Sequence, residues 1–149
     1  MKYGFDYIDG RDVPQTVIED DFTIQGKHNG TVHVENGTLT IQGELHGTLD
    51  VQSGAKAIII GKQHGTVSVA NNAEIVIFGE LNGTTNVSVY GTVVVEAHGK
   101  LAGTLSNNGT VIVRGVFGGA QSGHGELILE ENGYIKQPVI KNGMKYYEW

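Results

Sequence analysis

The 149-residue sequence contains no cysteine, which excludes a disulfide framework and a thiolate metal site. It has no run of about 18 apolar residues, the length that a membrane-spanning helix needs. The N-terminal MKYGFDYIDGRDVP lacks the apolar stretch of a signal peptide. Basic residues are few, because 10 Lys and Arg stand against 16 Asp and Glu, for a formal net charge of −6. We therefore expect a cytoplasmic protein with no integral membrane segment and no nucleic-acid partner.

Patterns typical of catalysis are also missing. No Ser-His-Asp or P-loop phrase occurs. The acidic residues are dispersed or paired with Lys, and no repeated Asp pair has the separation that glycoside cleavage requires. Aromatic residues are nearly absent from the middle of the chain, which ranks a sugar-binding or sugar-cleaving function last. We expect a protein that is not an enzyme and has no cofactor.

Glycine, in contrast, is abundant, and many of the 23 glycines belong to a repeated phrase, Gly-x-x-x-Gly. This phrase begins at six positions: Gly26, Gly43, Gly61, Gly79, Gly99 and Gly115. Successive copies are 17, 18, 18, 20 and 16 residues apart. Apolar and polar residues alternate between the glycines, as they do in strands. A repeat of this length, cut by Gly and Asn, predicts one turn of a β-solenoid per copy.

The predicted fold is an all-β, single-domain, right-handed parallel β-helix with about 18 residues per rung and six to seven rungs. We expect an N-terminal arm or cap at 1–21, the repeat domain at 22–117, and a final strand with a C-terminal cap at 118–149. Residues two and four before each phrase should point inward and stack: Phe22/Ile24, Leu39/Ile41, Ala57/Ile59, Ile75/Ile77, Val95/Ala97 and Val111/Val113. The 20-residue step predicts a bulge near residues 86–91.

Two outward columns carry polar residues. The residue after each first glycine alternates in sign: Lys27, Glu44, Lys62, Glu80 and Lys100. This column is either a charged recognition stripe or a device that fixes the register of the rungs, and the strict alternation favours the second interpretation. Two positions further on, His46 and His64 should stack as neighbours about 5 Å apart, a spacing at which two imidazoles can hold a divalent ion. The pattern offers no third ligand in that column, where Asn29 and Asn82 flank the pair. We therefore predict no metal site.

Four apolar residues occupy positions that should face water. Ile58 and Ile60 lie in one rung, and Val76 and Phe78 in the next. An exposed apolar patch of this kind is typical of an interface, and these four residues are the interface candidates. Two alternatives remain open: an aromatic terminus of the same chain (residues 3–8 or 144–149) covers the patch, or a second molecule does.

Phrases such as IQGELHGTLDV (41–51) and IFGELNGTTNV (77–87) resemble the β-helix domain of the bactofilins, the polymer-forming bacterial cytoskeletal proteins. The resemblance covers roughly residues 22–117. It implies a right-handed β-helix without a nucleotide or catalytic site, which joins end to end through its terminal rungs. The chain departs from that family in its aromatic, foldable ends, and in Thr where an acidic residue often follows the second Gly.

Two function classes follow from these observations. The first is a non-catalytic, bactofilin-like structural protein whose partner is itself, as a homo-oligomer or filament. The alternative is a capped acidic module that binds another protein, such as an immunity protein that inhibits a cognate bacterial toxin, because a net charge of −6 suits a basic partner.

Overall fold

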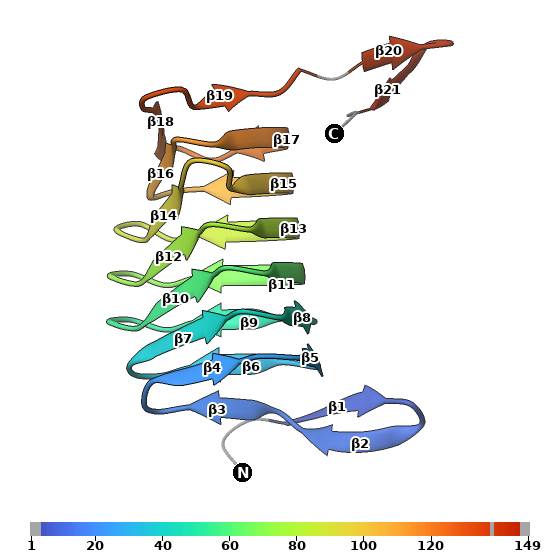
Figure 1. Ribbon diagram of the computed structural model, residues 1–149, viewed down its shortest axis with the longest axis vertical. Coiled ribbons are helices and arrows are strands. Elements are labelled where there is room, and N and C mark those ends of the chain that lie inside the picture. The colour runs from blue at the N-terminus through green and yellow to red at the C-terminus, as the bar shows by residue number, and fades with distance from the viewer. Residues whose placement is uncertain (1–3, 138, 147–149) are drawn as a thin grey trace.

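The computed structural model describes residues 4–137 and 139–146, and within these residues it contains strands and no helix. The strands stack into a parallel β-solenoid of seven rungs (Figure 1). In Figure 1 the near strands run to the right and the far strands return to the left while the chain climbs from N to C, so the coil is right-handed. The predicted all-β solenoid with rungs of about 18 residues is confirmed.

Two parallel sheets form the sides of the solenoid. The seven-stranded sheet contains β4 (Phe22–Ile24), β7 (Thr38–Ile41), β10 (Lys56–Ile59), β12 (Glu74–Ile77), β14 (Thr92–Val95), β16 (Thr110–Val113) and β18 (Glu126–Leu129). The ten-stranded sheet contains β3 (Thr16–Ile18), β5 (Lys27–Asn29), β6 (Val32–Val34), β8 (Glu44–His46), β9 (Leu49–Val51), β11 (Lys62–Val69), β13 (Glu80–Val87), β15 (Lys100–Asn107), β17 (Val116–Ser122) and β19 (Tyr134–Ile135). Each strand pairs with its equivalent one rung away.

A glycine column explains why the ten-stranded sheet can bend within one strand. Gly65 and Gly83 lie in the middle of β11 and β13 with φ of 125° and 121°, a region that favours glycine. A Cβ on Gly83 would lie 2.1 Å from the carbonyl oxygen of Gly65 in the rung below. Glycine at this corner is therefore required both by the backbone angle and by the close approach of successive rungs.

The core consists of aliphatic columns between the two sheets. Leu39, Ile41, Ile75 and Ile77 are fully buried, as the alternation predicts. Burial of such stacked side chains is the main stabilising contribution to the solenoid. Phe22 is an exception among the predicted inward positions, because it is 53% exposed on the edge strand β4, where no further rung lies below it.

One predicted core pair is wrong by two residues. The structure pairs Ile75 with Val93 and Ile77 with Val95, and Ala97 is exposed in a turn. The two extra residues of the 20-residue step lie between β14 and β15, at residues 96–99, and not near residues 86–91. Alignment on the glycines misplaced the insertion, because Gly99 follows the insertion while the strand before it keeps the regular spacing of 18.

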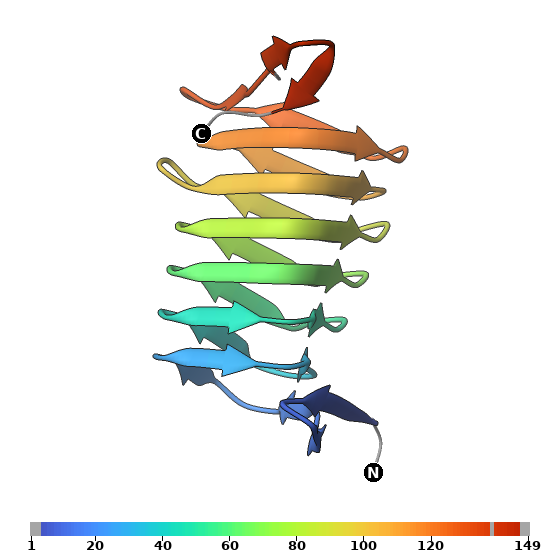
Figure 2. The same ribbon diagram turned by 90° about the vertical axis from the view of Figure 1, so that its right-hand side faces the viewer.

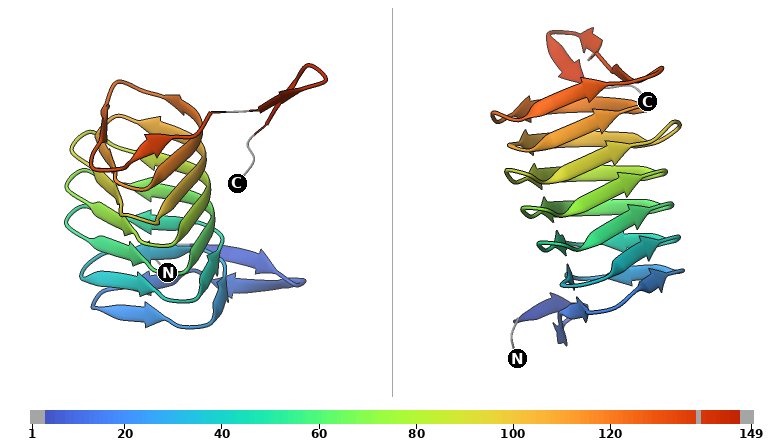
Figure 3. Two further views of the ribbon diagram at one scale, coloured as in Figure 1. Left: turned by 45° about the horizontal axis from the view of Figure 1, so that its top comes forward. Right: turned by 90° about the vertical axis from the view of Figure 1, so that its left-hand side faces the viewer.

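An antiparallel hairpin precedes the rungs and another follows them. β1 (Phe5–Ile8) pairs with β2 (Arg11–Pro14), and β20 (Val139–Lys141) pairs with β21 (Met144–Tyr146). Figures 2 and 3 show both hairpins projecting from the side of the stack that the ten-stranded sheet forms. Pro138, which precedes the second hairpin, lies outside the described residues.

Side-chain hydrogen bonds attach the first hairpin to the rungs. The Asp6 carboxylate accepts hydrogen bonds from the backbone N–H of Thr31 at 2.6 Å and from its hydroxyl at 2.8 Å. His33, which is 9% exposed, contacts Asp50 through Nδ1 and Gln15 through Nε2, both at 2.7 Å. These contacts hold residues 4–15 against the first rungs at a fixed place beside the stack.

Candidate functional site

The four interface candidates lie together on the outer face of the seven-stranded sheet. Ile58 and Val76 are direct neighbours on β10 and β12, and both are partly buried. Ile60 and Phe78 follow these strands and are 49% and 47% exposed. Alternation along each strand sends the core residues inward and these residues outward. The predicted apolar patch is therefore present in the structure.

The patch is longer than the sequence indicated. Val94 on β14 pairs with Val76, and the same register continues to Ile112 on β16 and Ile128 on β18. Five aliphatic side chains, Ile58, Val76, Val94, Ile112 and Ile128, thus form one outward row, which we call the aliphatic row. Val94 was not predicted to belong to this patch, because alignment of the rungs on Gly99 puts Glu96 and His98 at the outward positions of its rung.

Ile60 and Phe78 are exposed, so we compared the position of the patch with the positions of the two terminal segments that could cover it. Both terminal hairpins project from the side of the ten-stranded sheet, away from the aliphatic row (Figures 1 and 2). Within the described residues, neither terminal segment shields these two side chains from solvent. Residue 3 and residues 147–149 of the two aromatic ends lie outside the described part of the chain.

An ionic cluster borders the patch towards the C-terminal end. Arg114 occupies the outward position two rungs after Phe78, and Glu96 and Glu130 flank it in the rungs below and above. Arg114 Nε donates to Glu130 Oε1 at 3.0 Å, and its Nη1 donates to Glu96 Oε1. These hydrogen bonds, first to Glu130 and then to Glu96, raise the pKa of Arg114 above its usual value. Two carboxylates against one guanidinium give this cluster a formal net charge of −1, so the face is ionic at Glu96, Arg114 and Glu130 and apolar at Ile60 and Phe78.

Each sheet ends on a strand that has only one neighbour among the described strands. The seven-stranded sheet begins at β4 and ends at β18, and the ten-stranded sheet begins at β3 and ends at β19. Apolar side chains are exposed at both ends of the seven-stranded sheet, with Phe22 at 53% and Leu129 at 49%. Unpaired parallel strand edges with apolar side chains can accept a further rung.

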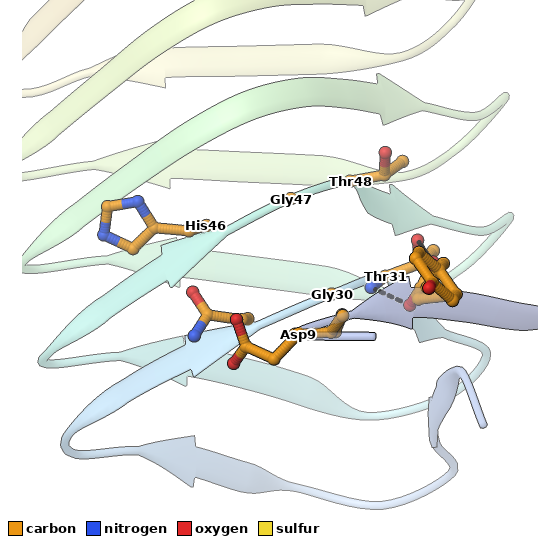
Figure 4. A pocket seen from close by; sticks show the side chains of 10 residues that line it. Asp9, Gly30, Thr31, His46, Gly47 and Thr48 are labelled. Carbon is orange, nitrogen blue, oxygen red and sulfur yellow. Dashed lines mark hydrogen bonds between the residues drawn. The ribbon is translucent and has the colours of Figure 1, made fainter. Parts of the chain in front are cut away.

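A polar cleft of about 540 Å³ lies between the first hairpin and the first two rungs. Asp6, Asp9, Asn29, Thr31, His46 and Thr48 are among its lining residues. Figure 4 shows His46 and Asp9 on different walls of this cleft, with His46 carried by the rung and Asp9 by the hairpin turn. The residues that line the cleft come from segments that are far apart in the sequence, so no sequence motif could predict the cleft.

The structure confirms that His46 and His64 stack. They are paired in register on β8 and β11, and their ring centroids are 4.8 Å apart with an interplanar angle of 22°. The sequence pattern offers no third ligand in the column of the two histidines, and the structure brings a third one close to them. Glu44 lies two residues before His46 on the same strand, and all three side chains offer ligand atoms within 4.8 Å of one another. Residues i and i+2 of a strand point to the same side, which is the signal that could have identified Glu44.

The alternating charge column also has the predicted register. Lys62 on β11 lies between Glu44 and Glu80 of the adjacent rungs, and Lys100 continues the column beside Glu80. A shift by one rung would place like charges next to one another, which disfavours it. The observed pairing is the one expected if the column fixes the register of the rungs.

No protein-family model matches the chain, and neither a curated protein nor a solved structure matches it. The described residues form no helix that is long and apolar enough to cross a membrane.

Proposed function

We propose that this protein is a non-catalytic structural scaffold that associates with copies of itself, in the manner of the bactofilins that its rungs resemble. The observation that carries the proposal is the state of the two ends. Both sheets finish on strands with a single partner, and both hairpins project sideways from the stack (Figures 1 and 3), with the first one reaching under the lower edge at Gly30, which Asp6 and Ile8 approach. The cytoplasmic location expected from the sequence belongs to the same proposal.

Physical chemistry supports end-to-end association at these edges. Backbone N–H and C=O groups along an unpaired strand edge need partners, and a parallel strand from another chain supplies them without any change of fold. Within the solenoid the same geometry recurs from rung to rung, because each rung pairs in register with the one below. Burial of Phe22 and Leu129 in such a contact would add a hydrophobic contribution.

Lateral association is the second way in which copies can meet. The aliphatic row and the two exposed side chains Ile60 and Phe78 form a flat apolar strip along the seven-stranded sheet. Strips of this kind bury against another flat surface, and sheet faces pack about 10 Å apart. A filament held by its ends can therefore pair with a neighbouring filament through this strip.

The same strip favours the alternative function, a module that binds a different protein. Its apolar centre and the net charge of −6 suit a partner with an apolar patch inside a basic surface. An immunity protein bound to a toxin is one example of such a pair. This alternative requires that the chain remains a monomer or dimer in the absence of its partner.

Light scattering over a concentration series, with electron microscopy of the most concentrated sample, tests the proposal. Three variants test the three possible contact surfaces one at a time: Phe22→Lys at the first edge, Leu129→Lys at the last edge, and Phe78→Lys on the lateral strip. Val89→Lys is the matched control, because Val89 is 55% exposed in a turn away from both ends.

We expect the wild type to grow with concentration and form elongated particles. The two edge variants should stop growth, Phe78→Lys should leave single filaments that no longer pair, and Val89→Lys should behave as the wild type. A monodisperse monomer or dimer at every concentration would contradict the scaffold proposal and favour the partner-binding alternative.

A further inference from the structure

The cluster of Glu44, His46 and His64 is a candidate metal centre on the outer face of the ten-stranded sheet. Glu44 and His46 come from β8, and His64 comes from β11 in the next rung. His46 Nε2 lies 3.6 Å from Glu44 Oε2, and the two imidazole rings are stacked at 4.8 Å. All three side chains are partly buried. They converge from one side of two adjacent strands on a common point.

The state of His46 Nε2 is a second, independent observation. This nitrogen is shielded from solvent and has no hydrogen-bond partner among the described residues. A polar atom that is shielded without a partner is destabilising, because it has lost its hydrogen bond to water. A metal ion bound to Nε2 would remove this deficit, and Glu44 and His64 offer the next two ligand atoms.

The donor set indicates which ions fit. Two neutral imidazoles and one carboxylate form the ligand set that zinc uses in open sites, where a water completes four-coordination. Imidazole nitrogen also suits Cu²⁺, Ni²⁺ and Co²⁺, whereas Mg²⁺ and Ca²⁺ prefer oxygen ligands. The single carboxylate leaves a net positive charge on a bound divalent ion, and Lys62 lies beside Glu44 in the charge column.

The distances require a small adjustment of the side chains. Tetrahedral zinc with bonds of about 2.0–2.1 Å places its ligand atoms about 3.3 Å apart, compared with separations of up to 4.8 Å in the cluster. Rotation about the side-chain bonds closes this gap without moving the strands, since all three residues are partly exposed. Of the three ligands, His46 also lines the polar cleft beside the first hairpin (Figure 4).

We propose that Glu44, His46 and His64 bind one divalent transition-metal ion of the zinc class per chain. The site is independent of self-association, because all three ligands belong to one chain and none lies at a terminal edge or on the aliphatic row. It would bridge two successive rungs near the N-terminal end, so an ion bound there also connects these rungs.

Titration of the untagged 149-residue chain with ZnCl₂ by calorimetry tests the proposal, together with the visible absorption of Co²⁺ as a probe of coordination. The ligand variants are Glu44→Gln, His46→Gln and His64→Gln. His124→Gln is the matched control, because His124 is exposed in a loop at the other end of the stack. Circular dichroism spectra and melting curves establish that each variant keeps the fold.

We expect one zinc ion per chain, and an intense Co²⁺ spectrum typical of a four-coordinate site. Each ligand variant should weaken zinc binding by at least about tenfold, since even residues that only support a ligand change affinity by about 10–100-fold. His124→Gln should bind as the wild type does. Zinc should also raise the melting temperature of the wild type, and at the same zinc concentration it should raise that of His64→Gln by less, because a ligand that binds only the folded chain stabilises it according to its affinity.

Three results would overturn the proposal. The first is no saturable binding at about 1 mM zinc, which corresponds to a negligible affinity for a built site. The second is equal weakening by His124→Gln and by the ligand variants, which would place the ion elsewhere. The third is a stoichiometry of one ion per two chains that depends on protein concentration, which would assign the ion to a contact between molecules.

Discussion

Replacement of Gly83 by alanine tests how tightly the rungs are stacked at the corner of the ten-stranded sheet. Gly83 has φ of 121°, and a Cβ there would lie 2.1 Å from the carbonyl oxygen of Gly65. Real Cβ atoms do not come so close to a backbone atom, so either the rungs separate or the strand shifts at this point. Both movements disturb the hydrogen bonds between β11 and β13.

The expected destabilisation has two parts. A non-glycine residue in a sparsely populated backbone region costs about 1–3 kcal/mol. Overpacking against a rigid neighbour costs a further ~1–3 kcal/mol, because the neighbour is backbone and cannot rotate away. The sum, roughly 2–6 kcal/mol, is a large fraction of the free energy of unfolding of about 5–15 kcal/mol that is typical of proteins.

Urea denaturation followed by circular dichroism measures this change, and two other glycines provide controls. Gly54 has φ of 83° and no atom within 4 Å of a Cβ, so Gly54→Ala keeps the backbone strain and removes the clash. Gly26 has open space and no positive φ, and Gly26→Ala should stay within about 0.5 kcal/mol of the wild type. Equal stabilities of Gly83→Ala and Gly54→Ala would refute the argument from close stacking.

Two further predictions concern the core and the first hairpin. Thr85→Val should raise the free energy of unfolding by about 1 kcal/mol in the same urea assay, because the hydroxyl of Thr85 is fully buried and has no hydrogen-bond partner in the described structure; a loss of stability would show that the hydroxyl is satisfied. Asp6→Ala should release the hairpin at residues 5–14, because it removes the acceptor of two hydrogen bonds from Thr31, and trypsin should then cleave faster after Arg11 while the rungs stay protected. Unchanged cleavage would mean that other contacts hold the hairpin.

Much of the candidate site could be predicted from single residues and their spacing. The outward positions of Ile58, Ile60, Val76 and Phe78 followed from alternation within two regular rungs, and the structure places them together. The stack of His46 on His64 followed from the 18-residue period. These predictions succeeded because in a parallel solenoid the neighbour of a residue is the residue one period away.

Other parts of the site depended on register that the repeat could not specify. Val94 belongs to the aliphatic row only because the two extra residues of its rung lie after β14, in the turn at residues 96–99. Any turn of a rung can accommodate two extra residues. The next glycine phrase then begins two residues later in the sequence whichever turn holds them, so the spacing of the phrases does not locate the insertion. The choice is made by packing, which keeps Val93 and Val95 in the core.

The sequence by itself determined the period of the chain, the inward and outward faces of its strands and hence the solenoid, because these depend on local alternation and on glycine at fixed spacing. Only the tertiary structure decided which turn takes the insertion and where the two hairpins lie against the stack. These features depend on contacts between segments with no common period. In such contacts, side-chain packing and hydrogen bonds such as those of Asp6 select one arrangement among several that the same local pattern permits.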